Sequence, residues 1–172
     1  MKIILIRHGE PNYEEVRKWG NIGLGFELAK LTDKGVKQAE DRSKDESLFD
    51  ADLIISSPYT RALQTAAILS KNLNISLEVE TDLHEWFADT KFLFDYDVFK
   101  ASEEFYANKG ILTNNSKYRF EPIDIIRKRV LNVLNKYQHF EKIIVVCHGI
   151  VMGSMTSIDD MIEHCGVREI EL

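Results

Sequence analysis

The stretches KIILIRHG (residues 2–9) and KIIVVCHG (residues 142–149) share one pattern, in which an unbroken apolar run leads into His-Gly. An apolar run without alternation is typical of a strand buried on both faces, as in a parallel sheet. In open α/β sheets, ligands bind just beyond the carboxyl ends of the parallel strands. If the two strands are neighbours, His8 and His148 meet at that edge, and Gly9 leaves room for the backbone to approach a ligand.

Further strands and helices alternate between these two stretches. Residues 53–55 are a third apolar run, residues 75–80 alternate as in a more exposed strand, and residues 167–172 could form a closing edge strand. We expect helices over about 33–47, with Thr32 as the N-cap, after a Ser57-Pro58 start, over about 122–138, and after Gly149. This alternation predicts a layered α/β fold.

The size and composition suit one soluble domain over residues 1–172. The chain is 44% hydrophobic and 29% charged, which is ordinary for a globular protein. Residues 86–121 hold 10 of the 17 aromatic residues and show no clean period. We interpret this segment as an insertion or lid over the edge of the sheet. Its rings either form a wall for a bulky, apolar phosphate ester or only pack into a small core of their own.

Charge and cysteine content narrow the possible partners and location. The net charge is −6, and the sequence has no dense Lys/Arg block of the kind that would predict binding to nucleic acid. The apolar run at the N-terminus is too short for a signal peptide, and no stretch is long enough to span a membrane, so we expect a cytoplasmic protein. Cys147 and Cys165 fit neither a disulfide framework nor a zinc motif.

The positive groups that an anion site would need are expected at the same sheet edge. The strand over residues 53–55 leads into Ser57, and Arg61 lies in the first turn of the following helix. Helix N-termini attract anions through their free N–H groups, and guanidinium groups bind two phosphate oxygens at once. Arg7 stands beside His8. Two arginines, two histidines and a helix N-terminus together suit a tetrahedral dianion.

Five segments carry a resemblance to a known family. They are Arg7-His8-Gly9-Glu10, Leu31-Thr32-Asp33-Lys34-Gly35 with Gln38-Ala39, Ser56-Ser57-Pro58-Tyr59-Thr60-Arg61-Ala62 with Gln64-Thr65-Ala66, Leu83-His84-Glu85-Trp86, and Val146-Cys147-His148-Gly149. In this order they resemble the histidine phosphatase superfamily, which includes the cofactor-dependent phosphoglycerate mutases. The resemblance implies a three-layer α/β/α sandwich with a mostly parallel central sheet and a small lid insertion.

The resemblance also implies a role for each matching residue. His8 would be the nucleophile that forms a phosphohistidine, while Arg7, Arg61 and His148, with Gly9, would bind the phosphoryl group. Glu85 would donate a proton to the leaving oxygen and later activate the hydrolytic water. The resemblance implies no metal and no organic cofactor, because the arginines neutralise the phosphoryl charge.

Several alternatives stay open at this point. Pro11 and Glu14 depart from the mutase pattern, which favours hydrolysis of a phosphomonoester over phosphoglycerate mutase activity. A phosphate-recognition module without catalysis is a third hypothesis. The substrate could be a small molecule or a phosphoprotein, and the oligomeric state is not readable. Asp82 or Asp89 could replace Glu85 as the acid.

The remaining histidines and glycines received other interpretations. We assign structural roles to His139 and His164 and leave His84 out of the site. A metal site formed by His8, His148 and a carboxylate is disfavoured because two nearby arginines would repel a cation. The glycines at 20, 23 and 25 do not have phosphate-loop spacing and predict a flexible loop near the site.

Overall fold

A five-stranded sheet forms the centre of the computed structural model, which describes residues 1–19 and 25–172. The predicted glycine loop therefore lies outside the described residues at Gly20 and Gly23. The strands are β1 (Lys2–Arg7), β2 (Leu53–Ser56), β3 (Leu77–Val79), β4 (Lys142–Cys147) and β5 (Val167–Glu171). They lie in the order β3-β2-β4-β1-β5, with β5 antiparallel to β1 and the other pairs parallel.

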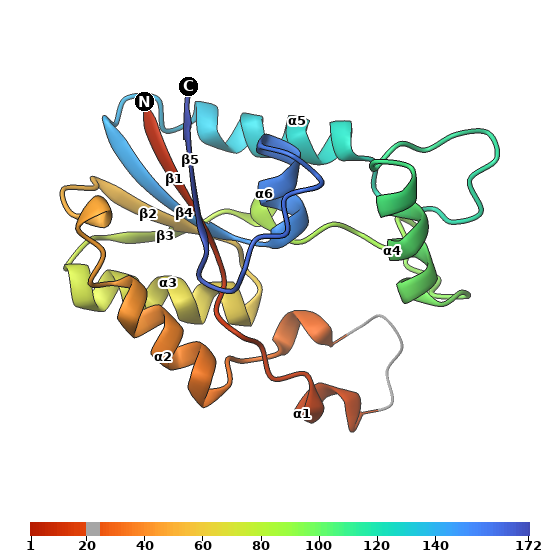
Figure 1. Cartoon of the computed structure of the whole chain (residues 1–172), viewed down its shortest axis with the longest axis horizontal. Helices are drawn as coiled ribbons and strands as arrows, with labels where there is room; N and C mark the ends of the chain where they lie inside the picture. Colours follow the sequence, from red (N-terminus) through yellow and green to blue (C-terminus); the bar gives the residue numbers. More distant parts are fainter. Residues whose placement is uncertain (20–24) are drawn as a thin grey trace.

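Helices cover both faces of this sheet, which confirms the layered α/β fold (Figure 1). On one face lie α2 (Asp33–Arg42) and α3 (Thr60–Leu73); on the other lie α5 (Ile123–Asn135) and α6 (Gly149–Met155). Two further helices, α1 (Glu14–Arg17) and α4 (Val98–Ala107), lie away from the sheet. The short 3₁₀ helices are η1 (Phe26–Leu28), η2 (Glu46–Leu48) and η3 (Thr81–Leu83).

Alternate residues of β1 supply two separate hydrophobic cores. Ile3 and Leu5 point into the core that contains α5 and α6, whereas Ile4 and Ile6 point into the core that contains α3. Successive side chains of a strand face opposite sides of the sheet, so a strand covered on both faces must be apolar throughout. This requirement explains why the quoted stretches show no alternation.

The register of the two central strands fixes the site. Arg7 on β1 pairs with Cys147 on β4, so His8 and His148 follow at equivalent positions of two neighbouring parallel strands. The prediction that both histidines meet at the carboxyl edge of the sheet is therefore confirmed. On the other side of β4, Ser56 pairs with Val146, which brings the start of α3 to the same edge.

Three predicted element boundaries are wrong. The first helix ends at Arg42, before residue 47, because Asp45 accepts the Ser47 N–H and starts η2 instead. The second predicted helix begins at Thr60, with Tyr59 at its N-cap position, so Ser57 and Pro58 precede it and do not cap it. The helix expected over 122–138 spans Ile123–Asn135. The Thr32 cap is confirmed, since its hydroxyl accepts the Gly35 N–H.

The aromatic segment 86–121 contains α4, which the sequence did not reveal. Only Ala101 and Phe105 are buried in this helix, so it has almost no apolar stripe to detect. Phe105 and Phe120 join the core beside α5, and the partly buried rings of Trp86 and Tyr118 pack against it. In the described part of the chain, no helix is both long and apolar enough to cross a membrane.

Candidate active site

His8 sits directly after β1 with its imidazole almost fully buried. Its Nδ1 lies 2.7 Å from the Gly9 carbonyl oxygen, so we assign the proton to Nδ1. The other ring nitrogen, Nε2, then carries a lone pair and accepts the Arg61 Nε–H at 3.0 Å. Burial and the nearby Arg61 charge hold the pKa of His8 well below its usual value. A neutral imidazole with an unprotonated ring nitrogen is the nucleophilic form.

His148 follows β4 and is completely buried. Its Nε2 lies 2.8 Å from the Ser57 hydroxyl oxygen, which also accepts the Tyr59 N–H at 3.2 Å. Because this oxygen already accepts one hydrogen bond, we assign its O–H as the donor to Nε2, which places the His148 proton on Nδ1. That Nδ1 has no hydrogen-bond partner among the described residues. The ring centroids of His8 and His148 are 5.2 Å apart.

The two predicted arginines flank the histidines. Arg61 is buried and donates from Nη1 to the Phe26 carbonyl oxygen at 3.1 Å, while its guanidinium lies over the Tyr59 ring. Arg7 donates to the Ile162 carbonyl oxygen, but its buried Nε has no partner among the described residues. The site thus contains two buried N–H donors without acceptors, from Arg7 and His148. Buried polar groups are rarely left unpaired, so these donors are candidate contacts for the oxygen atoms of a ligand.

Glu85 lies nearer to this cluster than its two predicted competitors. Its Oε2 is 3.9 Å from His148 Nδ1, and burial raises the pKa of its carboxyl group. Asp82 is exposed to solvent. Asp89 is buried, but Arg119 binds it with two hydrogen bonds and holds its pKa far below the usual range. A carboxyl group with a raised pKa suits proton donation, whereas Asp89 serves as an anchor of the segment 86–121.

The missing side chain of Gly9 leaves room for helix α2, a role that the sequence did not indicate. A Cβ atom at Gly9 would lie 2.5 Å from the carbonyl oxygen of Gly35 in α2. The Gly9 N–H donates to the Thr65 hydroxyl at 3.0 Å. The glycine is needed because α2 packs backbone to backbone against the His8 turn, and the expected contact of Gly9 with the phosphoryl group stays a prediction.

Two residues at the site were missed in the sequence. His164, which we expected to be structural, has its ring centroid 5.7 Å from that of His8. It reaches the site from the loop between α6 and β5, where no motif or periodicity indicated it. Ser57 was read as a helix cap although it lies inside a segment that resembles the family, and that segment was the available signal.

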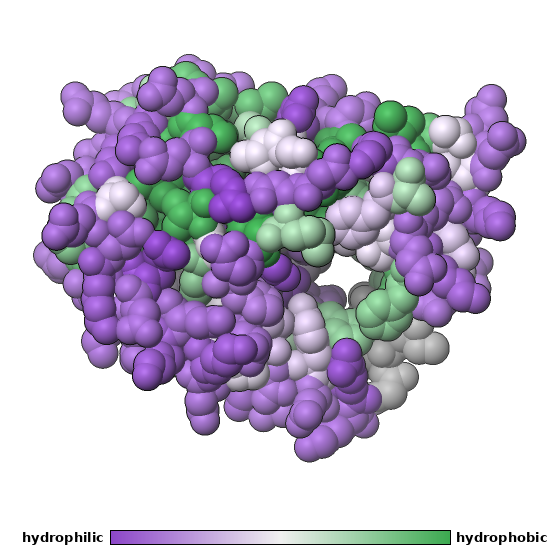
Figure 2. Space-filling model, viewed as in Figure 1, coloured by the Kyte–Doolittle hydropathy of each residue, from purple (hydrophilic) through white to green (hydrophobic). Residues whose placement is uncertain are grey.

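Two hollows meet at Glu85. One of 200 Å³ is bounded by Arg61, Glu85 and mainly aromatic side chains, and the other of 140 Å³ by Arg7, Glu85, Tyr106 and residues of the loop before β5. In the space-filling view, the molecule is hollowed between the part that carries α4 and the part that carries α1 (Figure 2). Among the described residues, no group of three or more His, Cys, Asp or Glu is arranged to hold a metal ion.

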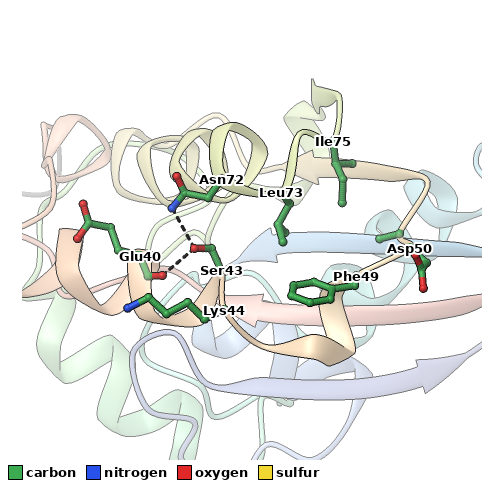
Figure 3. A pocket seen from close by; sticks show the side chains of 9 residues that line it. Glu40, Ser43, Lys44, Phe49, Asp50, Asn72, Leu73 and Ile75 are labelled. Carbon is green, nitrogen blue, oxygen red and sulfur yellow. Dashed lines mark hydrogen bonds between the residues drawn. The ribbon is translucent and has the colours of Figure 1, made fainter.

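A hollow of 1020 Å³, larger than these two, lies elsewhere. It is open and lined by residues from the ends of α2 and α3 and the turn at Phe49, where the Asn72 amide donates to the Ser43 hydroxyl (Figure 3). None of the candidate catalytic residues lines it. Size alone therefore does not locate the chemistry in this molecule, whereas the unpaired donors and shifted pKa values do.

Comparison with known proteins agrees with this geometry. Residues 3–160 match the family model described as histidine phosphatase superfamily (branch 1). A protein of Hydrogenobacter thermophilus with a provisional phosphoserine phosphatase name is 26% identical over 175 residues, covering 98% of this chain and 82% of the relative. The adenosylcobalamin/alpha-ribazole phosphatase of Escherichia coli is 27% identical over 158 residues, covering 86% and 73% of the two chains.

Solved structures agree on the fold. A mycobacterial glucosyl-3-phosphoglycerate phosphatase superposes with a TM-score of 0.73 at 16% identity, covering 98% of this chain and 88% of the other. At this identity the likeness concerns the arrangement of the chain and carries no information about the substrate. The three-layer, phosphoglycerate mutase-like architecture expected from the sequence is thus confirmed.

Proposed function

The chain belongs to the histidine phosphatase superfamily, and from that premise we propose that it hydrolyses a phosphomonoester through a phosphohistidine on His8. Family membership and the phosphatase names of its relatives support a phosphoric monoester hydrolase. The observation that carries the finer proposal is the pair of unpaired buried donors, Arg7 Nε and His148 Nδ1, beside the lone pair of His8 Nε2. The two N–H donors can bind oxygens of a phosphoryl group, and the His8 lone pair can attack its phosphorus.

The first half of the reaction transfers the phosphoryl group to the enzyme. Arg61 shifts its N–H from His8 to a phosphoryl oxygen, which frees the Nε2 lone pair to attack phosphorus. The P–O bond to the leaving alcohol breaks as the N–P bond forms, and Glu85 gives its proton to the leaving oxygen. Arg7, Arg61 and His148 Nδ1–H stabilise the negative charge on the equatorial oxygens.

The second half returns the enzyme to its starting state. The Glu85 carboxylate, now deprotonated, takes a proton from a water molecule that attacks the phosphorus. The N–P bond breaks, inorganic phosphate leaves, and both His8 and Glu85 regain their original forms. The arginine charges already neutralise the phosphoryl oxygens, so the proposal assigns no step to a metal ion or an organic cofactor.

Hydrolysis remains our preference over the two rival functions. A module that only recognises phosphate would not need a carboxylic acid with a raised pKa 3.9 Å from a phosphate-binding histidine. For a mutase, Glu14 replaces the expected amide and lies exposed at the start of α1. The proposal covers residues 1–172 as one catalytic domain in the cytoplasm. It favours a small-molecule ester and leaves a phosphoprotein to the substrate screen.

The experiment is hydrolysis of p-nitrophenyl phosphate in the presence of a chelator. We expect His8→Ala to lower kcat by roughly a thousandfold or more, because no other group can accept the phosphoryl group. The matched control is His139→Ala, which removes an exposed histidine and should leave kcat unchanged. Substantial turnover by His8→Ala, with its fold verified by circular dichroism, would refute the nucleophile. Hydrolysis that stops with the chelator would refute independence from metal.

A further inference from the structure

We propose that the 200 Å³ hollow beside Arg61 and Glu85 selects phosphomonoesters whose alcohol is apolar and carries no second negative charge. We further propose that Glu27 enforces the second condition. This inference rests on the proposed function and names the substrate class for the same site. It assigns specificity to side chains of the aromatic segment 86–121 and of η1, outside the phosphoryl-binding residues.

The walls of the hollow are mostly aromatic. An engineered apolar cavity of about 150 Å³ takes up benzene, so 200 Å³ accommodates an aromatic ring or an apolar group of similar size. The side chains come from three separate parts of the chain that converge on one space. Its apolar lining comprises Phe26, Tyr59, Trp86, Phe87, Ala88, Phe92, Phe94 and Val98.

The position of the hollow ties it to the leaving group. Glu85 is the proposed proton donor to the leaving oxygen, and it lines this hollow together with Arg61. The alcohol attached to that oxygen must therefore lie on the Glu85 side of the phosphoryl group. The 140 Å³ hollow also reaches Glu85, but it is smaller and contains Asp160 in addition to Arg7. We assign the alcohol to the larger, apolar hollow.

The backbone at the rim is held in an unusual conformation. Phe92 and Phe94 have left-handed φ values of 55° and 49°, which bulky side chains rarely adopt. The buried Asp89 carboxylate accepts the N–H groups of Lys91, Leu93 and Phe94 and so holds this turn. Such strain persists only where surrounding contacts impose it and is frequent at ligand-binding positions. This turn brings the Phe92 ring close to the Phe87 ring, with the two ring centroids 4.9 Å apart.

Apart from Arg61, which we assign to the phosphoryl group, the uncompensated charge in the hollow is negative. Asp89 is neutralised by Arg119, but Glu27 accepts only the Gly25 N–H and has no cationic partner among the described residues. Glu27 and Tyr59 line the same hollow, and burial together with the Glu27 charge raises the pKa of Tyr59 to about 12. A second phosphate or a carboxylate on the substrate would be repelled here, because like charges in a poorly hydrated hollow interact strongly.

Steady-state kinetics with a matched pair of esters tests this selection. For the wild type, we expect kcat/KM for phenyl phosphate to exceed that for 3-phosphoglycerate roughly 10- to 200-fold. Phe92→Ala should lower the value for phenyl phosphate by about two- to tenfold, since it removes one aromatic wall. Its control is Phe99→Ala, an exposed aromatic residue outside the hollow, which should change nothing.

A separate variant tests whether Glu27 excludes esters that carry a second negative charge. Glu27→Gln should narrow the ratio of the two kcat/KM values by about three- to tenfold, because it removes the repulsion of the anionic ester. The control Glu103→Gln changes an exposed carboxylate of α4 and should leave the ratio unaltered. A wild-type ratio near one, an unchanged ratio in Glu27→Gln, or equal effects of Phe92→Ala and Phe99→Ala would overturn the proposal.

Binding of non-hydrolysable analogues separates this inference from the proposed reaction. Calorimetry on the wild type should show that phenylphosphonate binds at least about tenfold more tightly than 3-phosphonopropionate, which carries a second anion. If this preference is present but no ester is hydrolysed, the catalytic proposal fails and the specificity stands. If both phosphonates bind equally, the specificity fails, even if His8-dependent hydrolysis is observed.

Discussion

The imidazoles of His8 and His148 are held in complementary tautomers by different kinds of partner. His8 donates to a backbone carbonyl and keeps its Nε2 lone pair, whereas His148 accepts from a hydroxyl and keeps its Nδ1–H. One ring can therefore attack phosphorus and the other can donate to a phosphoryl oxygen. Burial lowers the pKa of both rings, so both are neutral in the folded protein at neutral pH.

Ser57 sets the His148 tautomer, and this gives the prediction at the residue scale. We expect Ser57→Ala to lower kcat by about three- to tenfold, the effect of one lost hydrogen bond of about 1 kcal/mol. The matched control is Ser56→Ala, whose buried hydroxyl donates to the Ser57 carbonyl and touches no histidine. Steady-state kinetics of both variants is the measurement. Equal losses in the two would show that Ser57 acts only through local structure.

At this scale the sequence predicted the charged and nucleophilic residues but not their partners. Arg7, His8, Arg61 and His148 could be found because each stands at the end of a strand or the start of a helix. His164 could not, because it comes to His8 from an irregular loop whose path depends on how β5 pairs with β1. Ser57 was misread because a hydroxyl before a helix is more often a cap.

The elements around the site are locked together by close backbone contacts. A Cβ atom on Gly35 in α2 would lie 2.3 Å from the Glu10 carbonyl oxygen, just after the His8-Gly9 turn. Side-chain amides support the same contact, since Gln38 accepts the Glu10 N–H and Gln64 accepts the Leu31 N–H. The segments that resemble the family thus contain, besides the catalytic residues, the residues that hold α2 and α3 against the end of β1.

Gly35→Ala gives the prediction at the element scale. We expect it to destabilise the protein by about 1–3 kcal/mol and to lower kcat, because the methyl group pushes the His8 turn away from α2. Gly153→Ala in α6 is the matched control, since its nearest contact would be an ordinary 3.5 Å, and it should be neutral or slightly stabilising. Urea unfolding of both variants measures the difference. Equal stability of the two would contradict the contact.

Element prediction succeeded where burial was complete and failed at exposed boundaries. The central strands β1 and β4 were recognisable because both faces are covered, which leaves an unbroken apolar run. Helix α4 was invisible because it is mostly exposed, and η2 replaced the end of α2 through one Asp45 side-chain hydrogen bond. A single side-chain contact decides where such a helix ends, and the hydrophobic periodicity of the sequence gives no information about that contact.

On the scale of the whole molecule, an acidic chain gathers cations and buried histidines at one edge of its sheet. The pKa values of His8, His84, His148 and His164 are all lowered, chiefly by burial. The pKa of Glu85 is raised, also by burial. In this site, cationic side chains lie close together with little negative charge among the described residues around them. A bound phosphate dianion would supply the missing negative charge.

This arrangement predicts that stability falls as the pH is lowered below about 6.5. Below this pH the unfolded chain takes up protons at histidines that stay neutral in the folded state. The free energy of unfolding therefore falls by at most about 1.4 kcal/mol per pH unit for each of His8 and His148. Glu85 acts in the opposite sense below its raised pKa and offsets part of the loss. Losses from the carboxylates with lowered pKa values belong to a separate window, below about pH 4.

Urea unfolding at about pH 7.5 and about pH 5.5 measures this effect. His148→Gln should flatten the pH dependence, whereas His139→Gln, at an exposed position, should not. Inorganic phosphate should raise the stability of the wild type because it binds only the folded state. A wild-type stability that is constant or rises on acidification would contradict the assignment of buried neutral histidines.

The central claim is that the phosphoryl group passes through His8, and trapping the intermediate tests it most directly. Glu85→Gln should still form the phosphohistidine from p-nitrophenyl phosphate, whose leaving group departs as a stable anion without an acid, but should hydrolyse it slowly because the base for the water is missing. The variant is mixed with p-nitrophenyl phosphate, quenched in alkali, which preserves phosphohistidine, and digested for peptide mass spectrometry. The account predicts one added phosphoryl group on the peptide that contains His8, and none in the variant that also carries His8→Ala. A phosphoryl group on another residue, or continued turnover of Glu85→Gln with no modified peptide, would contradict it.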